Sequence, residues 1–330
     1  MELPLTFKFH GWSIRYNLLV SDKATTIQRA QRAPVKCVVF VHGTPWSSAV
    51  FQPVVEALQA KGSYKILVYD LPGYGQSQEF DSGSTATARA GFPGDTSVKF
   101  QAKALAELCK YVQLDGKEGC PIPAVIAHDI AGAIVLRAHL LEGCDFDTIM
   151  LVDANVVLPW GDGFFKQVRS DPQAYVKMPP NIFEAVVRAV IQSACYNPKV
   201  LQTGWEDILA QPWIGCHSAG AETDERQRSF IRQIAQANDQ DVADMLVGDL
   251  YGCIRCHIKI VWGKQDQWIP REKVEDSIRR MSDKVMEHVF IPNAGHLVML
   301  DQPERFAIEV FDWLIRFGTP RSLIEPLTGS

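Results

Sequence analysis

Apolar and polar residues alternate at the start of the chain. Alternating runs occupy residues 5–9 and 14–18, and His10-Gly11 stands between them. Alternation places successive side chains on opposite faces of a strand, and a short polar link between two such runs is typical of a turn. The opening residues therefore predict a β-hairpin.

Six later segments are continuously apolar, which is typical of parallel strands buried on both faces of a sheet. They lie at 37–41, 66–69, 124–127, 148–152, 257–262 and 285–291. Segments with helical periodicity separate most of them, at about 48–61, 98–114, 130–142, 271–281 and 303–317. This alternation predicts a doubly wound α/β fold with a mostly parallel sheet. Its ligand-binding loops are expected at the carboxyl ends of the strands.

One long stretch, residues 155–252, interrupts the alternation. It contains helix-like segments, no convincing buried strand, and six prolines that divide it into short pieces. A helical segment inserted between two strands of one sheet lies across the strand ends, so we expect residues 155–252 to form a helical cap. Residues 1–154 and 253–330 then form the core.

The segment around Asp129 carries the most informative chemistry. An apolar strand pattern ends at Ala127, a helical pattern begins at Ile130, and small residues follow at 131 and 132. Small flanking residues allow a sharp strand-to-helix turn, which exposes the central side chain at the top of the sheet. This is the spacing of a nucleophile elbow with a carboxylate at its centre. The alternative interpretation is an aspartate that caps the following helix.

Other polar groups also follow predicted strands. His42-Gly-Thr-Pro45 follows the first apolar run, and a backbone N–H beyond a glycine can point at an anion. Asp266 follows the run at 257–262, and His296 follows the run at 285–291. One such group alone is usually a structural hydrogen-bonding residue. A nucleophile, an acid and a histidine in this chain order instead match a catalytic triad.

With these motifs, the sequence resembles the α/β-hydrolase superfamily over nearly its whole length. The resemblance implies a catalytic triad of Asp129, Asp266 and His296. It also implies that the backbone N–H groups of Thr44 and Ile130 form an oxyanion hole. Within the superfamily, His-Asp at the elbow followed by small residues is similar to the epoxide hydrolases and haloalkane dehalogenases.

Aspartate in place of serine changes the expected reaction. Attack of a carboxylate on an acyl carbonyl gives an unstable anhydride, whereas attack on a saturated carbon gives an alkyl ester of Asp129. His296, oriented by Asp266, then activates the water that hydrolyses this ester, and the oxyanion donors stabilise the tetrahedral intermediate. This argues against a simple esterase, lipase or peptidase, and it leaves epoxide opening and carbon–halogen cleavage.

In the epoxide hydrolases, cap tyrosines supply a proton to the leaving oxygen. Tyr175, Tyr196 and Tyr251 are therefore candidate substrate-binding residues, although each alone is more typical of a packing aromatic. Ser229-Phe-Ile-Arg-Gln233 resembles the segment where those enzymes carry Trp-Tyr-Arg, and Ile231 stands at the tyrosine position.

A dehalogenase instead needs N–H donors for the halide, often from a tryptophan directly after the nucleophile. Ile130 and Thr44 stand at the two expected halide positions, which leaves Trp46 or a cap tryptophan as donor. We therefore expect an epoxide hydrolase acting on a hydrophobic small molecule. One alternative is a haloalkane or haloacid dehalogenase with the same triad. The other is a hydrolase fold that binds a ligand without turnover.

Composition excludes several other classes. The 330 residues are 47% hydrophobic and 22% charged, as in soluble globular proteins. A net charge of −5 gives no basic footprint for nucleic acid. No apolar run approaches the roughly 18 residues that a membrane helix needs, and no secretion signal is visible. We therefore expect a cytoplasmic protein with reduced cysteines.

Cys253-Ile-Arg-Cys256-His257 fits the attachment pattern of c-type haem. Haem attachment requires export to an oxidising compartment, and no second Cys/His pair stands at zinc-finger spacing. We expect no cofactor and no metal. The sequence leaves the oligomeric state open.

Overall fold

The structure is a computed structural model. It describes residues 1–317 except 21–34, 63, 82, 84–89, 118, 162 and 215–219, and it describes only the backbone of 220–224. Residues 318–330, which the sequence assigns to the core, lie outside the described residues.

One eight-stranded sheet forms the centre of the fold, in the order β1-β2-β4-β3-β5-β6-β7-β8. The strands are β1 (Leu5–Phe9), β2 (Trp12–Val20), β3 (Lys36–Val41), β4 (Tyr64–Tyr69), β5 (Ala124–His128), β6 (Thr148–Val152), β7 (His257–Gly263) and β8 (Val285–Ile291). β1 and β2 form the predicted hairpin, β2 pairs antiparallel with β4, and all other pairings are parallel. The predicted mostly parallel sheet is confirmed.

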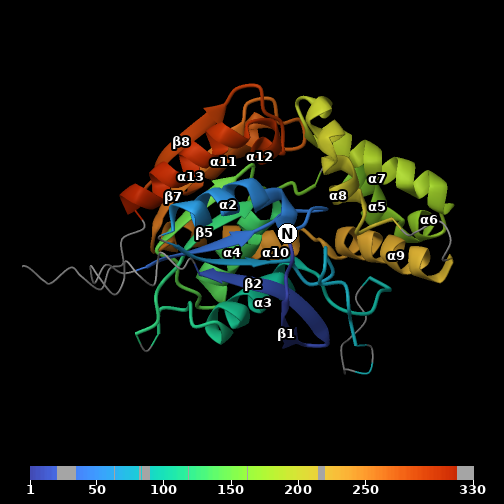
Figure 1. Ribbon diagram of the computed structural model, residues 1–330, viewed down its shortest axis with the longest axis horizontal. Helices are drawn as coiled ribbons and strands as arrows, with labels where there is room; N and C mark the ends of the chain where they lie inside the picture. The colour runs from blue at the N-terminus through green and yellow to red at the C-terminus, as the bar shows by residue number, and fades with distance from the viewer. Residues whose placement is uncertain are drawn as a thin grey trace, which may run out of the picture.

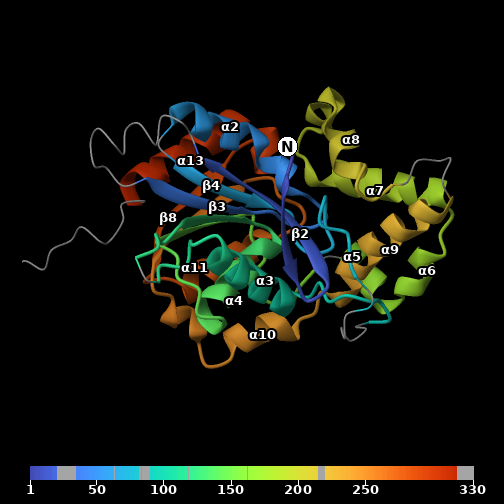
Figure 2. The same ribbon diagram turned by 60° about the horizontal axis from the view of Figure 1, so that its bottom comes forward.

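Helices cover both faces of this sheet (Figures 1 and 2). α2 (Gln52–Lys61) and α13 (Pro303–Phe317) pack together on one face, and α3 (Val98–Tyr111) and α4 (Ile130–Leu141) on the other. α11 (Arg271–Arg280) lies on the same side as α3 and α4 in Figure 2. β5 and β6 are buried at every position, which explains their unbroken apolar sequences.

Residues 155–252 lie between β6 and β7, and we call them the insertion. Within their described part the structure has helices and no strand. The helices are α5 (Gly163–Ser170), α6 (Pro172–Val176), α7 (Pro180–Ala194), η2 (Pro198–Thr203), α8 (Trp205–Ala210), α9 (Gly220–Gln236), α10 (Gln240–Leu246) and η3 (Leu250–Cys253). α5 to α9 gather beside the sheet in both views (Figures 1 and 2).

The last part of the insertion does not lie with the helices that form the rest of it. α10 packs against α3 and α4 on one face of the sheet. The buried side chain of Arg137 on α4 contributes to this position, because it donates to the Asp241 carbonyl at 2.8 Å and the Asp244 carboxylate at 3.0 Å. A buried guanidinium requires such acceptors, and α10 supplies them.

The middle of the insertion is anchored to the loop after β8. Asp301, at the end of the short helix α12 (Val298–Asp301), accepts the backbone N–H groups of Tyr196 and Asn197 at 2.8 and 3.1 Å. The same carboxylate accepts the Gly295 N–H at 2.8 Å. One side chain therefore ties the insertion to the loop that carries His296.

The loop that carries His296 packs closely against Gly263, at the end of β7. A Cβ there would lie 2.0 Å from the Gly295 carbonyl oxygen and 2.8 Å from that of Ala294. Both are backbone atoms with little room to move, so we expect Gly263→Ala to lower the free energy of unfolding by about 3 kcal/mol. Urea denaturation measures this. Gly163→Ala, where no atom lies within 4 Å, is the control and should change stability by less than about 0.5 kcal/mol.

Candidate active site

Asp129 occupies the sharp turn between β5 and α4. Its φ of 57° and ψ of −123° lie in a region that side-chain-bearing residues rarely adopt. Three backbone hydrogen bonds hold it there. Its N–H donates to the Val152 carbonyl, and its own carbonyl accepts from Gly132 and Asn155. Its side chain makes no capping hydrogen bond to α4, so the cap interpretation has no support in the geometry.

Glycines make room for this turn. A Cβ on Gly43 would lie 2.6 Å from the Asp129 Cβ, and a Cβ on Gly132 would lie 2.6 Å from the Ala154 Cβ. The Gly43 backbone is not left-handed, so close approach is what requires glycine there. His42 fixes the same loop, because its Nδ1 bonds the Gly43 carbonyl at 2.8 Å and its Nε2 accepts the Leu71 N–H at 2.9 Å.

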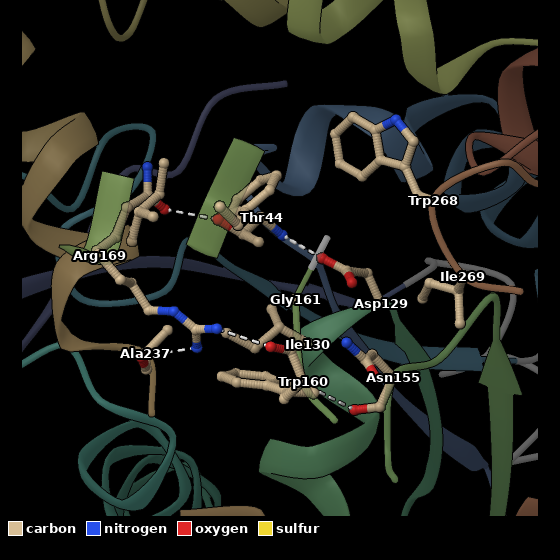
Figure 3. A pocket seen from close by; sticks show the side chains of 13 residues that line it. Thr44, Asp129, Ile130, Asn155, Trp160, Gly161, Arg169, Ala237, Trp268 and Ile269 are labelled. Carbon is tan, nitrogen blue, oxygen red and sulfur yellow. Dashed lines mark hydrogen bonds between the residues drawn. The ribbon is translucent and has the colours of Figure 1, made fainter. Parts of the chain in front are cut away.

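The two oxygens of the Asp129 carboxylate face different groups. Oδ2 accepts the Thr44 backbone N–H at 2.9 Å (Figure 3). Oδ1 lies 3.7 Å from Nε2 of His296. The Ile130 N–H, next in the chain, also lowers the pKa of this carboxyl, so both predicted oxyanion donors act on Asp129 itself.

His296 is held by Asp266. Its Nδ1 lies 2.9 Å from Asp266 Oδ2, and both side chains are fully buried. Asp266 Oδ1 accepts the backbone N–H groups of Trp268 and Ile269 at 2.8 and 3.2 Å, which fixes the carboxylate. The structure thus brings Asp129, His296 and Asp266 into one line of contacts.

Aromatic rings stack on the histidine. The Trp268 ring lies 4.8 Å from the His296 ring at 22°, and the Trp46 ring lies 5.5 Å from Trp268 at 24°. Such stacking holds the plane of the imidazole ring beside Asp129.

Burial is the main influence on the charge of Asp129. It raises the pKa of this carboxyl from 3.8 to about 6, although His296 and the two backbone N–H groups favour the charged form. Asp153, which directly follows β6, is fully buried, and burial followed by the charge of Asp266 raises its pKa well above the ordinary value. Asp153 accepts the Gly263 N–H at 2.7 Å, so its partner is backbone.

A pocket opens above Asp129. Its wall is mostly apolar, with a few polar side chains, as small-molecule sites usually are. It is lined by Thr44, Asp129, Ile130, Asn155, Trp160, Gly161, Phe165, Arg169, Gln233, Ile234, Ala237, Trp268 and Ile269 (Figure 3). The Arg169 guanidinium donates to the carbonyls of Trp160 and Ala237 at 2.7 and 3.2 Å, so part of its hydrogen bonding is used within the protein.

The four predicted substrate-binding residues lie outside this lining. Trp46 stacks against Trp268. The Tyr251 hydroxyl donates to the Val156 carbonyl. Tyr175 packs edge-on against Phe164, and Tyr196 is 49% exposed. These tyrosines therefore occupy packing or surface positions.

The pocket also contains polar side chains that the sequence did not single out. Trp268 stands two residues after Asp266 in the same motif, and Gln233 ends the segment in which a tyrosine was expected. Both residues therefore belong to motifs that the sequence already marks as functional. Asn155 follows β6 and so lies at the carboxyl end of a core strand, where a pocket residue is expected. Arg169 had no comparable signal, because it lies on α5 of the insertion.

The chain belongs to the Alpha/beta hydrolase family, whose profile matches residues 38–310. An alpha/beta hydrolase fold protein from Burkholderia ambifaria is 28% identical, with a TM-score of 0.75 over 94% of this chain and 98% of that one. The superfamily membership implied by the motifs is therefore confirmed.

More distant structures share the fold. A thermophilic esterase from Thermogutta terrifontis is 19% identical, with a TM-score of 0.66 over 95% of this chain and 97% of its own. A meta-cleavage product hydrolase from Pseudomonas fluorescens is 14% identical, with a TM-score of 0.63 over 95% and 98%. A search of curated proteins found no match. Among the helices of the described residues, none has both the length and the apolar character to cross a membrane.

The raised pKa of Asp129 predicts a stability cost. A carboxyl whose pKa rises on folding contributes stability below about pH 3.8 and loses it as pH rises through about 6. We expect Asp129→Asn to raise the free energy of unfolding by about 1–3 kcal/mol at pH 8, with the gain vanishing near pH 4. Denaturation at both pH values measures this, and intact mass checks that the amide persists. Asp283→Asn, at an exposed site, should show no such gain.

Proposed function

We propose that this hydrolase opens an epoxide on a hydrophobic small molecule through an alkyl ester of Asp129. The supporting observation is that the two oxygens of one carboxylate have different neighbours. Oδ2 accepts the Thr44 N–H, while Oδ1 faces His296. In a serine hydrolase those donors receive the carbonyl oxygen of the substrate. Here the nucleophile's own oxygen occupies them, which disfavours attack on an ester and favours displacement at a saturated carbon.

The reaction follows from this arrangement. Asp129 Oδ1 attacks a ring carbon, the carbon–oxygen bond of the ring breaks, and its electron pair stays on the ring oxygen. Water gives that oxygen a proton and becomes hydroxide. His296 takes a proton from a second water molecule, whose oxygen attacks the ester carbonyl. The Thr44 and Ile130 N–H groups, beside the carboxylate, stabilise the tetrahedral oxyanion. On collapse, His296 returns its proton to the departing oxygen and the diol leaves. The oxygen of the second water remains in Asp129, whose carboxyl loses its proton to the hydroxide.

The indole donors of the pocket support an epoxide over a halide. The Trp160 N–H donates to the Asn155 carbonyl and the Trp268 N–H to the Ser193 hydroxyl, each at 3.1 Å. Thr44 and Ile130, at the expected halide positions, carry no side-chain N–H. A halide would therefore meet indoles that are already hydrogen-bonded within the protein.

Carbon–halogen cleavage is the second candidate, and one observation favours it. The described pocket lining contains no tyrosine hydroxyl that would protonate a ring oxygen, whereas a halide leaves as a stable anion and needs N–H donors alone. Both candidates share the Asp129 ester, so tests of the ester apply to either.

Isotope labelling distinguishes covalent attack from general-base activation of water. With enzyme in excess, one turnover of styrene oxide in ¹⁸O-water should give unlabelled diol, because the product oxygen comes from Asp129. The label should appear in the peptide that contains Asp129. Mass spectrometry measures both. Labelled diol with an unlabelled peptide would refute covalent attack.

Replacement of the base should trap the ester. His296→Gln is expected to accumulate an adduct near about one equivalent, because alkylation proceeds while hydrolysis stops. Intact-protein mass measures the adduct. His288→Gln, at an exposed site on β8, is the matched control and should turn over normally. If neither an adduct nor turnover appears with epoxides or alkyl bromides, the proposed Asp129 ester is refuted.

A further inference from the structure

Gln233, on helix α9 of the insertion, reaches the pocket beside the nucleophile. Its side chain is deeply buried, with the residue 2% exposed. Its Oε1 accepts the Thr44 hydroxyl at 3.0 Å, and the Thr44 hydroxyl oxygen accepts that of Tyr74 at 3.3 Å. A chain of hydrogen bonds thus runs from Tyr74 through Thr44 to the oxygen of this amide.

This chain of hydrogen bonds fixes the orientation of the Gln233 side-chain amide. Thr44 has one hydroxyl proton, and giving it to Gln233 holds the amide oxygen toward Thr44 and turns Nε2 away. The Nε2 group is buried and has no hydrogen-bond partner within the described part of the chain. An unsatisfied buried donor costs free energy, and functional sites are where such a cost persists.

Other buried glutamines of the same helix are satisfied. The Gln227 Nε2 donates to the carbonyls of Tyr175, Val176 and Met178. The Gln236 Nε2 donates to the Gly94 carbonyl at 2.9 Å. Gln233 differs from both in lining the pocket, where a ligand can satisfy its donor.

We propose that Gln233 binds the leaving atom of the substrate, the epoxide ring oxygen, through its Nε2 N–H groups. This inference rests on the proposed function. Thr44 fixes the position of Gln233 relative to Asp129, because its backbone N–H holds Asp129 Oδ2 and its hydroxyl holds Gln233 Oε1. One residue therefore sets the spacing between the nucleophile and the donor.

The Gln233 amide stabilises the negative charge that develops on the ring oxygen, and it does not give that oxygen a proton. As Asp129 Oδ1 bonds to carbon, the electron pair of the breaking bond moves to the ring oxygen, and the N–H groups stabilise that charge. Water then supplies the proton. Thr44 and Tyr74 are positioning residues in this scheme. Burial raises the pKa of Tyr74 well above its ordinary value, so its hydroxyl keeps the proton that it donates to Thr44.

Two identical substitutions on α9 separate this role from a structural one. Gln233→Leu removes the donor, and Gln227→Leu removes an amide that holds the backbone together. With styrene oxide, Gln233→Leu should slow formation of the Asp129 adduct by about 100-fold, leave hydrolysis of the ester within about twofold, and keep Tm within about 2 °C of the wild type. Gln227→Leu should lower Tm by about 4 °C or more and leave adduct formation unchanged.

The outcomes distinguish the two proposals. Rapid quench with intact mass measures adduct formation, and a melting curve measures Tm. If the wild type forms the adduct and Gln233→Leu forms it within about threefold of that rate, the inference is overturned and the proposed function stands. A loss of Tm in Gln233→Leu equal to that in Gln227→Leu also overturns it. If wild type forms no Asp129 adduct with styrene oxide or an alkyl bromide, both proposals fail.

Discussion

The hydrogen bond from the Thr44 backbone N–H to Asp129 Oδ2 is the interaction around which the site is built. It needs a carboxylate in a strained turn, a glycine at 43 that lets the two loops touch, and a histidine at 42 that holds the donor loop. Burial opposes this hydrogen bond, because it favours the neutral form of the Asp129 carboxyl. The fold therefore supports a charge in an unfavourable place, which is typical of reactive carboxylates.

Much of this was predictable because the relevant signals are local. Strands buried on both faces must be apolar throughout, so their positions follow from sequence. The carboxyl ends of parallel strands share one edge of a sheet, and this brings Asp129, Asp266 and His296 together once the strands are known. The elbow spacing is equally local, since it reflects the small residues that a sharp turn demands.

The insertion was less predictable for a physical reason. Helical periodicity tells which face of a helix is buried, but not which atoms of neighbouring helices meet. Tyr251 is buried, yet its hydroxyl bonds a backbone carbonyl, while Gln233 supplies a polar group to the pocket. The position of α10 depends on the buried Arg137 of a distant helix, a contact that no local pattern encodes.

Asp301 links two parts of the molecule that are often considered separately. Its carboxylate binds Tyr196 and Asn197 of the insertion and also Gly295, the residue before His296. Lifting this part of the insertion would break bonds on the same carboxylate that steadies the histidine loop. The insertion and the loop that carries the base therefore share one anchor.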